Sequence, residues 1–480
     1  MTFSTQTETV LERFREISAI PRPSKKEERI GAWLREFAER RSWESQSDTA
    51  GNVVLRVPAS AGREHEPIVV LQGHQDMVCE KTPETEHDFD HQGIVPVVDG
   101  EWLRAEGTTL GADNGIAIAL ALAIAEDPEV SHPPLELLFT VDEETGLTGA
   151  SELDPSLLSG RILINIDSED EGVLTVGCAG GTDVRIKWKP GREKRPKNTK
   201  PWTVRIGGLV GGHSGVQIHE KRANANVLLG RTLARIADEE PVHLVSVSGG
   251  SAHNAIPRDA TATIWTAAEG IENIALEMRN AIAADYGERE PAATVDILPE
   301  TDAKKKALSP KKSMKLINLL VALPHGVAMM SPDIEGLVET SSNLATVRSK
   351  KGKIEIGVSA RSSNEANMNA LVERISAVAH LVGAKAKVGN SYPSWEPDMD
   401  SRLLAKCREV YQQHFESEPV VEAIHAGLEC GVIGAKFDSM DMISIGPTIR
   451  APHSPDECLY LPSLDRVYVF LSELLKRSFQ

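Results

Sequence analysis

The sequence predicts an α/β protein in which a domain with a mixed, mostly parallel sheet is interrupted by an inserted α+β domain. Three observations support this fold class. Short apolar runs alternate with helical patterns in the first third of the chain, as in a sheet covered by helices. The composition becomes basic and rich in turn residues around 177–200. Helix–strand alternation of the first kind then resumes near residue 397.

The first domain is expected over 1–180 and again over 395–480. Its predicted strands are the apolar runs at 67–71 (PIVVL), 135–141, 161–166, 420–424 and 440–445. The segment 114–126, NGIAIALALAIAE, is apolar on nearly every side, so we expect a buried helix there. Two further helices are expected at 403–414 and 464–476.

The inserted domain is expected over 181–394, because its elements have the pattern of an antiparallel α+β region. The predicted strands are 202–210, 242–247, 260–265, 353–359 and 384–388. The predicted helices are 223–238, 271–284 and 367–382.

Composition excludes several classes of protein. The 480 residues include 52 Lys and Arg against 70 Asp and Glu, a formal charge of -18 that disfavours binding to nucleic acid or to an anionic membrane. No apolar run approaches the ~18 residues that span a bilayer, and the N-terminus lacks the apolar core of a signal peptide. The five cysteines are scattered without a C-x-x-C pair. We therefore expect a cytoplasmic protein that binds neither nucleic acid nor membrane.

Acidic and histidine side chains recur where the apolar runs end, which is where ligands sit in open parallel sheets. His74 and Asp76 follow the first run and, being two residues apart, can point the same way, so that Asp76 orients His74 toward a metal. The alternative is an ordinary capped loop. Asp113 precedes the apolar helix, where it would serve equally as an N-cap.

Three consecutive acids, Asp142, Glu143 and Glu144, follow the second run and would repel one another without a cation. One glutamate can bind metal while its neighbour acts as a base, although a solvated charge cluster remains the alternative. Asp167 follows the third run, and His453 follows the strand expected at 440–445. A histidine before Ser-Pro is also common in plain loops.

Together these residues indicate a pair of divalent ions of the zinc, manganese or cobalt type, because magnesium and calcium sites seldom recruit histidine. The sequence has no H-E-x-x-H, G-x-S-x-G or G-x-x-x-x-G-K-[ST] motif that would indicate another catalytic centre.

Seven segments occur in an order that resembles one peptidase family. They are GHQDMV, TTLGADNGIAIA, TVDEETGLTGA, NIDSEDEG, GGHSG, HAGLECG and RAPHSPDE, and they span residues 73–457. This series is similar to that of the bacterial aminoacyl-histidine (Xaa-His) dipeptidases, within the aminoacylase/carboxypeptidase clan of co-catalytic zinc peptidases. The resemblance implies a catalytic domain of zinc-peptidase type with an inserted lid, and two metal ions, Zn²⁺ in the first place with Mn²⁺ or Co²⁺ as alternatives.

The resemblance also implies roles for individual residues. Asp76 would orient a metal ligand, Glu143 would be the general base, and Asp113 would bridge the two ions. The five implied metal ligands are His74, Asp113, Glu144, Asp167 and His453.

The implied activity is hydrolysis of dipeptides with a free amino terminus, β-alanyl-histidine among the candidates, and we expect a homodimer. His213, in the GGHSG turn of the inserted domain, would stabilise the oxyanion, with His253 and Arg361 as competing candidates. Glu429 would bind the substrate's ammonium group. The alternatives are an N-acyl amino acid amidohydrolase of the same clan and a non-catalytic metal-binding interaction protein.

Overall fold

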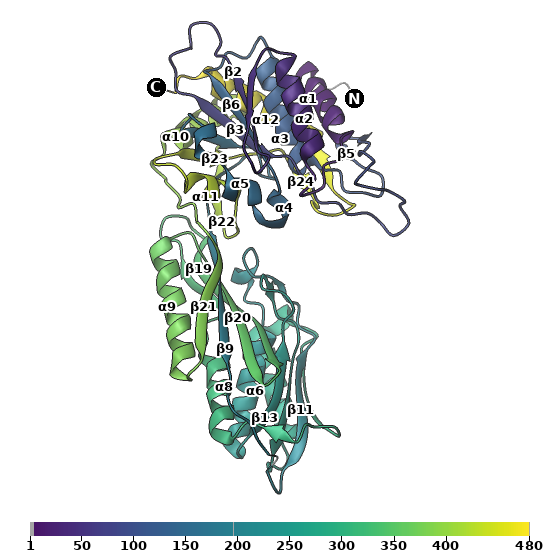
Figure 1. The fold of residues 1–480 in the computed structure, drawn as a ribbon, viewed down its shortest axis with the longest axis vertical. Coiled ribbons are helices and arrows are strands. Elements are labelled where there is room, and N and C mark those ends of the chain that lie inside the picture. Colours follow the sequence, from purple (N-terminus) through teal and green to yellow (C-terminus); the bar gives the residue numbers. More distant parts are fainter. Residues whose placement is uncertain (1–3, 195, 480) are drawn as a thin grey trace. The chain divides into compact units, whose positions relative to one another are not determined.

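The computed structural model describes residues 4–194 and 196–479, which form two compact units (Figure 1). Unit 1 contains the chain up to residue 177, residues 395–423 and the chain from 428 onward. Unit 2 contains 178–394 and the short segment 424–427. The sequence analysis placed all of 395–480 in one domain, whereas 424–427 groups with unit 2.

Unit 1 is built on an eight-stranded sheet with the order β1-β2-β6-β3-β7-β23-β8-β22. The strands β6, β3, β7 and β23 at its centre pair in parallel, while β1, β2 and β8 join antiparallel. The strands are β1 (Glu44–Ser47), β2 (Val53–Val57), β3 (Val69–His74), β6 (Leu135–Thr140), β7 (Ile162–Asn165), β8 (Val173–Cys178), β22 (Val420–Ile424) and β23 (Asp441–Ser444). The predicted mixed α/β class is confirmed.

Helices bury the parallel centre of this sheet. The apolar helix α3 (Ala112–Glu126) packs against β3, and α1 (Thr5–Ser18) and α12 (Leu461–Lys476) pack against α3. Because α3 is enclosed on all sides, its residues from Ile116 to Ile124 are at most 1% exposed, which explains its uniformly apolar sequence. The remaining helices of unit 1 are α2 (Glu28–Glu39), α4 (Glu143–Gly146), α5 (Thr148–Glu152), α10 (Arg402–Phe415) and α11 (Glu429–Gly434).

A four-stranded antiparallel sheet in unit 1 joins distant parts of the chain. It has the order β24-β25-β5-β4 and consists of β4 (Val97–Asp99), β5 (Trp102–Arg104), β24 (Ile449–Arg450) and β25 (Cys458–Tyr460). The loop between β24 and β25 carries His453.

Unit 2 is an antiparallel α+β unit with a nine-stranded sheet. The order is β16-β11-β15-β13-β19-β20-β9-β21, and β18 pairs with β19. The strands are β9 (Gly180–Trp188), β11 (Lys200–Gly207), β13 (His243–Gly249), β15 (Ala260–Thr266), β16 (Thr294–Pro299), β18 (Gly326–Met330), β19 (Val338–Lys350), β20 (Lys353–Ser362) and β21 (Lys385–Tyr392).

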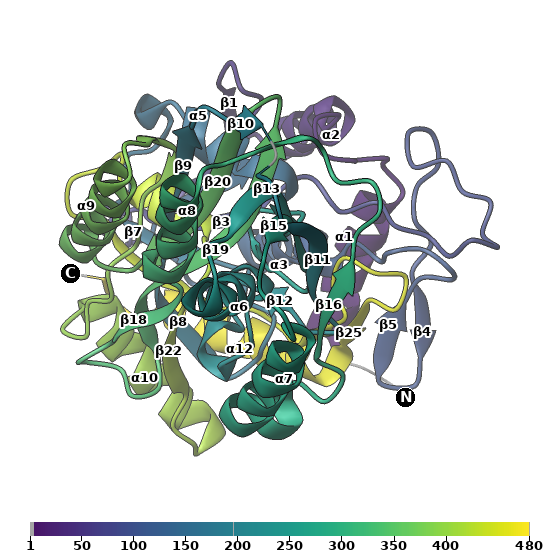
Figure 2. The same cartoon turned by 90° about the horizontal axis from the view of Figure 1, so that it is seen from below.

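Four helices of unit 2 pack against its sheet, as Figure 2 shows. They are α6 (Ala225–Glu239), α7 (Glu272–Tyr286), α8 (Pro310–Ala322) and α9 (Glu365–Leu381). One hydrophobic cluster runs through the layer between helices and sheet, including Val184 and Ile186 of β9 and Ile356 and Val358 of β20. The alternate residues of these strands therefore lie on the opposite face of the sheet.

Two short pairs complete unit 2. They are β10 (Glu193–Lys194) with β17 (Lys306–Ala307), and β12 (Gly212–His213) with β14 (Ala255–Ile256). No helix in the described part of the chain has the length and apolar character needed to cross a membrane.

Candidate metal centre

The proposed metal ligands converge at the carboxyl ends of the parallel strands of unit 1. His74 is the last residue of β3, Glu144 follows β6 closely, and Asp167 follows β7. Asp113 lies at the start of α3, and His453 reaches the same place from the loop after β24. Three groups of ligand atoms each lie close enough to hold an ion: His74 with Asp113 and Asp167, Asp113 with Glu144 and His453, and His74 with Glu143 and Glu144.

Asp113 lies between the two histidines. Its Oδ1 is 3.1 Å from His74 Nε2, and its Oδ2 is 3.0 Å from His453 Nε2. Asp167 Oδ1 lies 3.5 Å from His74 Nε2, and Glu144 Oε2 lies 3.1 Å from His453 Nε2. One carboxylate is therefore shared by two ligand sets, which is the arrangement that a bridged pair of ions requires.

Asp76 fixes both His74 and the acidic turn. Its Oδ1 accepts from His74 Nδ1 at 3.1 Å and from the Glu143 backbone N–H at 3.1 Å. Its Oδ2 accepts from Ser24 Oγ at 2.8 Å and from the Glu144 backbone N–H at 3.3 Å. Burial acts to raise the pKa of Asp76, but hydrogen bonds from His74 and Ser24 lower it to about 2, so the carboxylate stays ionised.

The three consecutive acids take different directions. Asp142 has a left-handed φ of 49°, and its carboxylate accepts from the hydroxyls of Thr145 and Thr148 instead of facing the metal ligands. Glu144 is oriented toward His453 and has one buried oxygen, Oε1, without a hydrogen-bond partner among the described residues. The turn at Asp142 thus separates a local structural carboxylate from the two glutamates of the site.

The charge balance of the cluster suits divalent cations. Burial, with the nearby carboxylates of Asp113 and Glu144, raises the pKa of Asp167 to about 6. Burial acts to lower the pKa of His74, but the surrounding carboxylates, Asp167 first, raise it well above its ordinary value. Hydrogen bonds to Asp113 and Glu144 raise the pKa of His453 to about 11. Buried carboxylates outnumber the imidazoles, and together with the orphaned Glu144 Oε1 they fit the donor set of two ions of the zinc, manganese or cobalt type.

Two residues that the sequence analysis did not single out hold the start of α3. The Glu457 carboxylate accepts from four successive backbone N–H groups, Oε2 from Leu110 and Gly111 and Oε1 from Ala112 and Asp113, at 2.8–3.2 Å. The buried Arg22 donates to the carbonyls of Gln75, Asp76 and Gly111. Glu457 belongs to the RAPHSPDE segment. Nothing in that segment indicates that Glu457 caps the start of a helix more than 300 residues earlier in the chain.

Glu429 lies within the sheet region of unit 1. The side chain is fully buried, and its Oε2 accepts from Gln72 Nε2 at 2.6 Å and from Thr140 Oγ1 at 2.7 Å. Burial raises the pKa of Glu429 to about 8. The role in ammonium binding stays a prediction, and the observed hydrogen bonds add a structural one, since they join α11 to β3 and β6.

In unit 2, His213 and Arg361 lie together around Gly215. A Cβ atom on Gly215 would stand 3.1 Å from both Arg361 Nε and His213 Cε1, so the glycine permits their close approach. His213 Nδ1 accepts from the backbone N–H groups of Gly215 and Val216, at 3.3 and 3.2 Å. Burial lowers the pKa of His213, and the charges of Arg361 and His253 lower it further. The imidazole is therefore neutral, with its proton on Nε2.

The two competing candidates differ from His213 in their surroundings. Arg361 Nη1 donates to Tyr392 Oη at 2.7 Å, while its buried Nε has no partner among the described residues. The His253 side chain is 69% exposed, and its Nδ1 lies 3.4 Å from Asp183 Oδ1. The turn of His253 lies beside that of His213, since the Ser214 backbone N–H donates to the Asn254 carbonyl at 2.8 Å, but the His253 side chain faces Asp183.

The comparisons with known proteins match this chain over nearly its full length. Residues 70–477 match the model of peptidase family M20/M25/M40. The cytosol non-specific dipeptidase of Escherichia coli (strain K12) is 41% identical over 466 residues, which cover 96% of each chain. The solved aminoacylhistidine dipeptidase of Vibrio alginolyticus matches 98% of this chain and 96% of its own, with a TM-score of 0.91 at 38% identity.

A more distant solved structure shares the fold. An aminopeptidase of Bacillus cereus matches 98% of both chains with a TM-score of 0.57 at 16% identity. The shared carboxylate between two histidine-containing ligand sets, the two-unit fold and the match over residues 70–477 agree with one another. On this evidence the chain is a member of peptidase family M20/M25/M40.

Proposed function

We propose that the chain is a metal-dependent dipeptidase that hydrolyses the peptide bond of dipeptides with a free amino terminus, Xaa-His dipeptides included. Two relatives that match nearly the whole chain, one compared by sequence and one by structure, are dipeptidases by name, which supports this substrate class. The structural observation that carries the proposal is the position of Asp113 between the two ligand sets.

The two ions proposed are divalent, with Zn²⁺ in the first place and Mn²⁺ or Co²⁺ as alternatives. His74, Asp113 and Asp167 would hold one, and Asp113, Glu144 and His453 would hold the other. When bound, such ions lower the pKa of a coordinated water and polarise a carbonyl oxygen.

Glu143 is the proposed general base. Its backbone is fixed by Asp76, and burial raises the pKa of its carboxyl well above the ordinary value, so the group holds a proton more readily than a free glutamate. In the proposed reaction Glu143 accepts a proton from the attacking water and delivers it to the leaving amine.

His213 is the proposed donor to the oxyanion. With Nδ1 occupied by two backbone N–H groups, the ring presents Nε2–H as a donor in one fixed orientation. A preorganised donor of this kind stabilises charge that develops in the transition state without reorganising at the moment of reaction.

Hydrolysis of a substrate panel tests this function. The panel contains β-alanyl-histidine, glycyl-histidine, a tripeptide and an N-acetyl amino acid, each assayed after chelation and with added Zn²⁺, Mn²⁺ or Co²⁺. We expect metal-dependent cleavage of the dipeptides and little cleavage of the other two. Preferential cleavage of the N-acetyl amino acid would favour an amidohydrolase, and no cleavage of any substrate by the metal-loaded protein would favour a non-catalytic binding protein.

The cellular setting is proposed on the same basis. The Escherichia coli relative is described as cytosolic, and we propose a cytoplasmic location and dipeptides as the small-molecule partners. The expected homodimer stays a prediction.

A further inference from the structure

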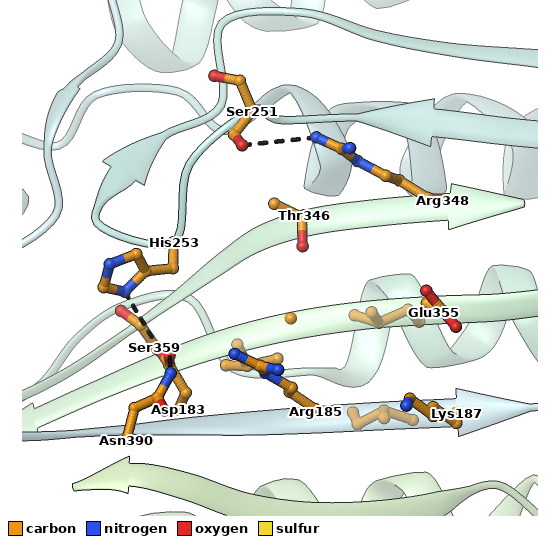
Figure 3. A pocket seen from close by; sticks show the side chains of 14 residues that line it. Asp183, Arg185, Lys187, Ser251, His253, Thr346, Arg348, Glu355, Ser359 and Asn390 are labelled. Carbon is orange, nitrogen blue, oxygen red and sulfur yellow. Dashed lines mark hydrogen bonds and ion pairs between the residues drawn. The ribbon is translucent and has the colours of Figure 1, made fainter. Parts of the chain in front are cut away.

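A cavity of about 390 Å³ lies on the face of the unit 2 sheet that points away from its hydrophobic core (Figure 3). Its floor is formed by β9, β19 and β20, and the turn that carries Ser251 and His253 forms one edge. Every lining residue belongs to unit 2, and none of them is a proposed metal ligand. Its volume is that of a small-molecule site.

The floor is open because β20 has a glycine at its centre. In the register of the sheet, Gly357 stands between Arg185 of β9 and Thr346 of β19. A Cβ atom on Gly357 would lie 2.7 Å from Thr346 Oγ1, so any larger residue would narrow the cavity. Glycine weakens a strand interior and often marks a place where a ligand approaches closely. Gly357 is therefore consistent with a ligand that lies against the backbone of β20.

Cations surround the open floor. Arg185 and Lys187 are exposed on β9, and Arg348 lies on β19, where its Nη2 donates to the carbonyls of Gly250 and Ser251 at 3.3 and 3.4 Å. Within the described residues, neither Arg185 nor Lys187 forms an ion pair.

Two acids also line the cavity. Asp183 is already engaged, since Asn390 Nδ2 donates to its Oδ2 at 2.9 Å and His253 Nδ1 lies 3.4 Å from its Oδ1. Glu355 stands between Lys187 and Arg348 in the register. The cavity is therefore lined by three cations, Arg185, Lys187 and Arg348, and by two carboxylates. The guanidinium of Arg185 lies on the cavity side of the sheet, where its N–H donors can meet a ligand.

The charge of unit 2 supports the same conclusion. Residues 178–394 and 424–427 contain 30 Lys and Arg against 22 Asp and Glu, a net charge of +8, whereas the rest of the chain carries -26. A cationic cavity on a cationic unit attracts anions although the whole chain is acidic.

We propose that this cavity binds a small organic anion that carries carboxylate or phosphate groups. The guanidinium of Arg185 would pair with one such group, because its planar fork matches the geometry of both. Lys187 adds charge, and the hydroxyls of Thr346 and Ser359 are donors on the floor and edge. The proposal does not depend on the peptidase function, since the residues that carry it, Arg185, Lys187 and Gly357, have no role in the proposed hydrolysis.

Isothermal titration calorimetry on the metal-loaded full chain at low salt tests the proposal with two probes, glutarate and inorganic phosphate. We expect saturable binding of at least one probe, and which probe binds distinguishes a carboxylate from a phosphate ligand. Arg185→Gln should weaken that binding at least about tenfold, since it removes a charge-assisted bidentate pair. Gly357→Val should abolish it by filling the floor while keeping every charge.

Arg205→Gln is the matched control, because Arg205 is an exposed arginine on β11 of the same sheet and does not line the cavity. Arg185→Lys serves as the conservative variant and should retain part of the affinity. Thermal unfolding of each variant establishes that it is folded. The proposal is overturned if the wild type shows no saturable binding of either probe, or if Arg185→Gln and Gly357→Val bind as tightly as Arg205→Gln.

Discussion

At the scale of single residues, the adjacent Glu143 and Glu144 show how one backbone turn can separate two chemical roles. Both backbone N–H groups donate to Asp76, which fixes the turn, and the side chain of Glu144 is directed to His453. Glu143 lies near His74, but its side chain forms no hydrogen bond or ion pair with a histidine among the described residues, and it is the residue proposed to meet the reacting water. The proposed roles therefore predict different effects for the substitutions Glu143→Gln and Glu144→Gln.

Glu143→Gln should reduce kcat by about 10²–10⁴, because the amide keeps the shape of the side chain but cannot accept a proton. Its metal content should remain close to that of the wild type. Glu144→Gln should instead lower the metal content, because it removes a charged ligand oxygen. The measurements are kcat and the bound metal per chain after dialysis. Exchanged phenotypes would show that the two roles are assigned the wrong way round.

His213→Ala should lower kcat by about 10²–10³ with a small change in KM, as for the loss of one oxyanion donor. His219→Ala is the matched control, because His219 is an exposed histidine of the same loop. Steady-state kinetics and metal content are measured for both. A His213→Ala enzyme with near-normal kcat and reduced thermal stability would mean that the ring serves only the turn.

At the scale of elements, the parallel strands explain why much of the site is predictable from the sequence. Residues that follow adjacent parallel strands meet at one sheet edge. Apolar runs that are followed by His74, Glu144 and Asp167 therefore already indicate a common site. The predicted helix at 114–126 is confirmed within two residues as α3. These features are local in sequence, so the pattern of apolar residues along the chain is enough to predict them.

Other parts of the site depend on contacts between distant segments, which no local pattern contains. Glu457 reaches the start of α3 across more than 300 residues, and Arg22 reaches the same turn from the N-terminal region. The burial of Glu429 depends on Gln72 and Thr140 from two other elements. A sequence motif can mark such residues as notable, but only the fold shows what they contact.

Glu457→Gln should lower both stability and metal affinity. The amide has one acceptor oxygen, so it leaves two of the four N–H groups from Leu110 to Asp113 unsatisfied, at a cost of about 1–3 kcal/mol. Asp113 then loses part of the support for its position. Asp456→Asn is the control, because Asp456 is the exposed neighbour. Unchanged unfolding and metal titrations for Glu457→Gln would rule out this capping role.

A partly buried histidine in unit 2 predicts acid sensitivity. Burial lowers the pKa of His325 to about 4, and its Nδ1 accepts from Asn224, the N-cap of α6. The unfolded chain binds a proton near its ordinary pKa of about 6.5, so the folded state loses stability as the pH falls from about 6.5 toward about 4.

His325→Asn keeps an acceptor but cannot titrate in this range. Between about pH 7.5 and about pH 5 the variant should lose about 1–2 kcal/mol less than the wild type in chemical denaturation of unit 2. His380→Asn, at an exposed histidine of the same unit, is the control and should behave as the wild type. Equal acid sensitivity of all three proteins would contradict the assignment to His325.

At the scale of the whole molecule, charge is divided between the two units. Unit 1 has 22 Lys and Arg against 48 Asp and Glu, whereas unit 2 has 30 against 22. The overall charge of -18 therefore describes neither unit, and the acidic unit is the one that carries the proposed metal ligands. Such a field raises the local concentration of cations, both metal ions and positively charged substrates.

This charge distribution predicts a salt effect that depends on substrate charge. The kcat/KM for dipeptides with a lysine side chain should fall several-fold as ionic strength rises from about 0.01 M to about 0.1 M, where the screening length shortens from about 30 Å to about 10 Å. Neutral dipeptides measured in the same series should change little. Parallel salt dependence for both classes would show that the field of unit 1 does not guide substrates.

The four residues 424–427 have a consequence for exchanging unit 2 between related enzymes. They begin at the last residue of β22 and end before α11, yet they belong to unit 2, where His425 Nε2 lies 2.7 Å from Ser341 Oγ of β19. The insertion is therefore not one continuous cassette. In a chimera that takes only 178–394 from a homologue, the residue at position 341 would come from the homologue, whereas His425, which contacts it, would come from this chain. A graft that carries both segments would transfer the complete module, and alignments that treat the second segment as part of unit 1 would misplace the boundary.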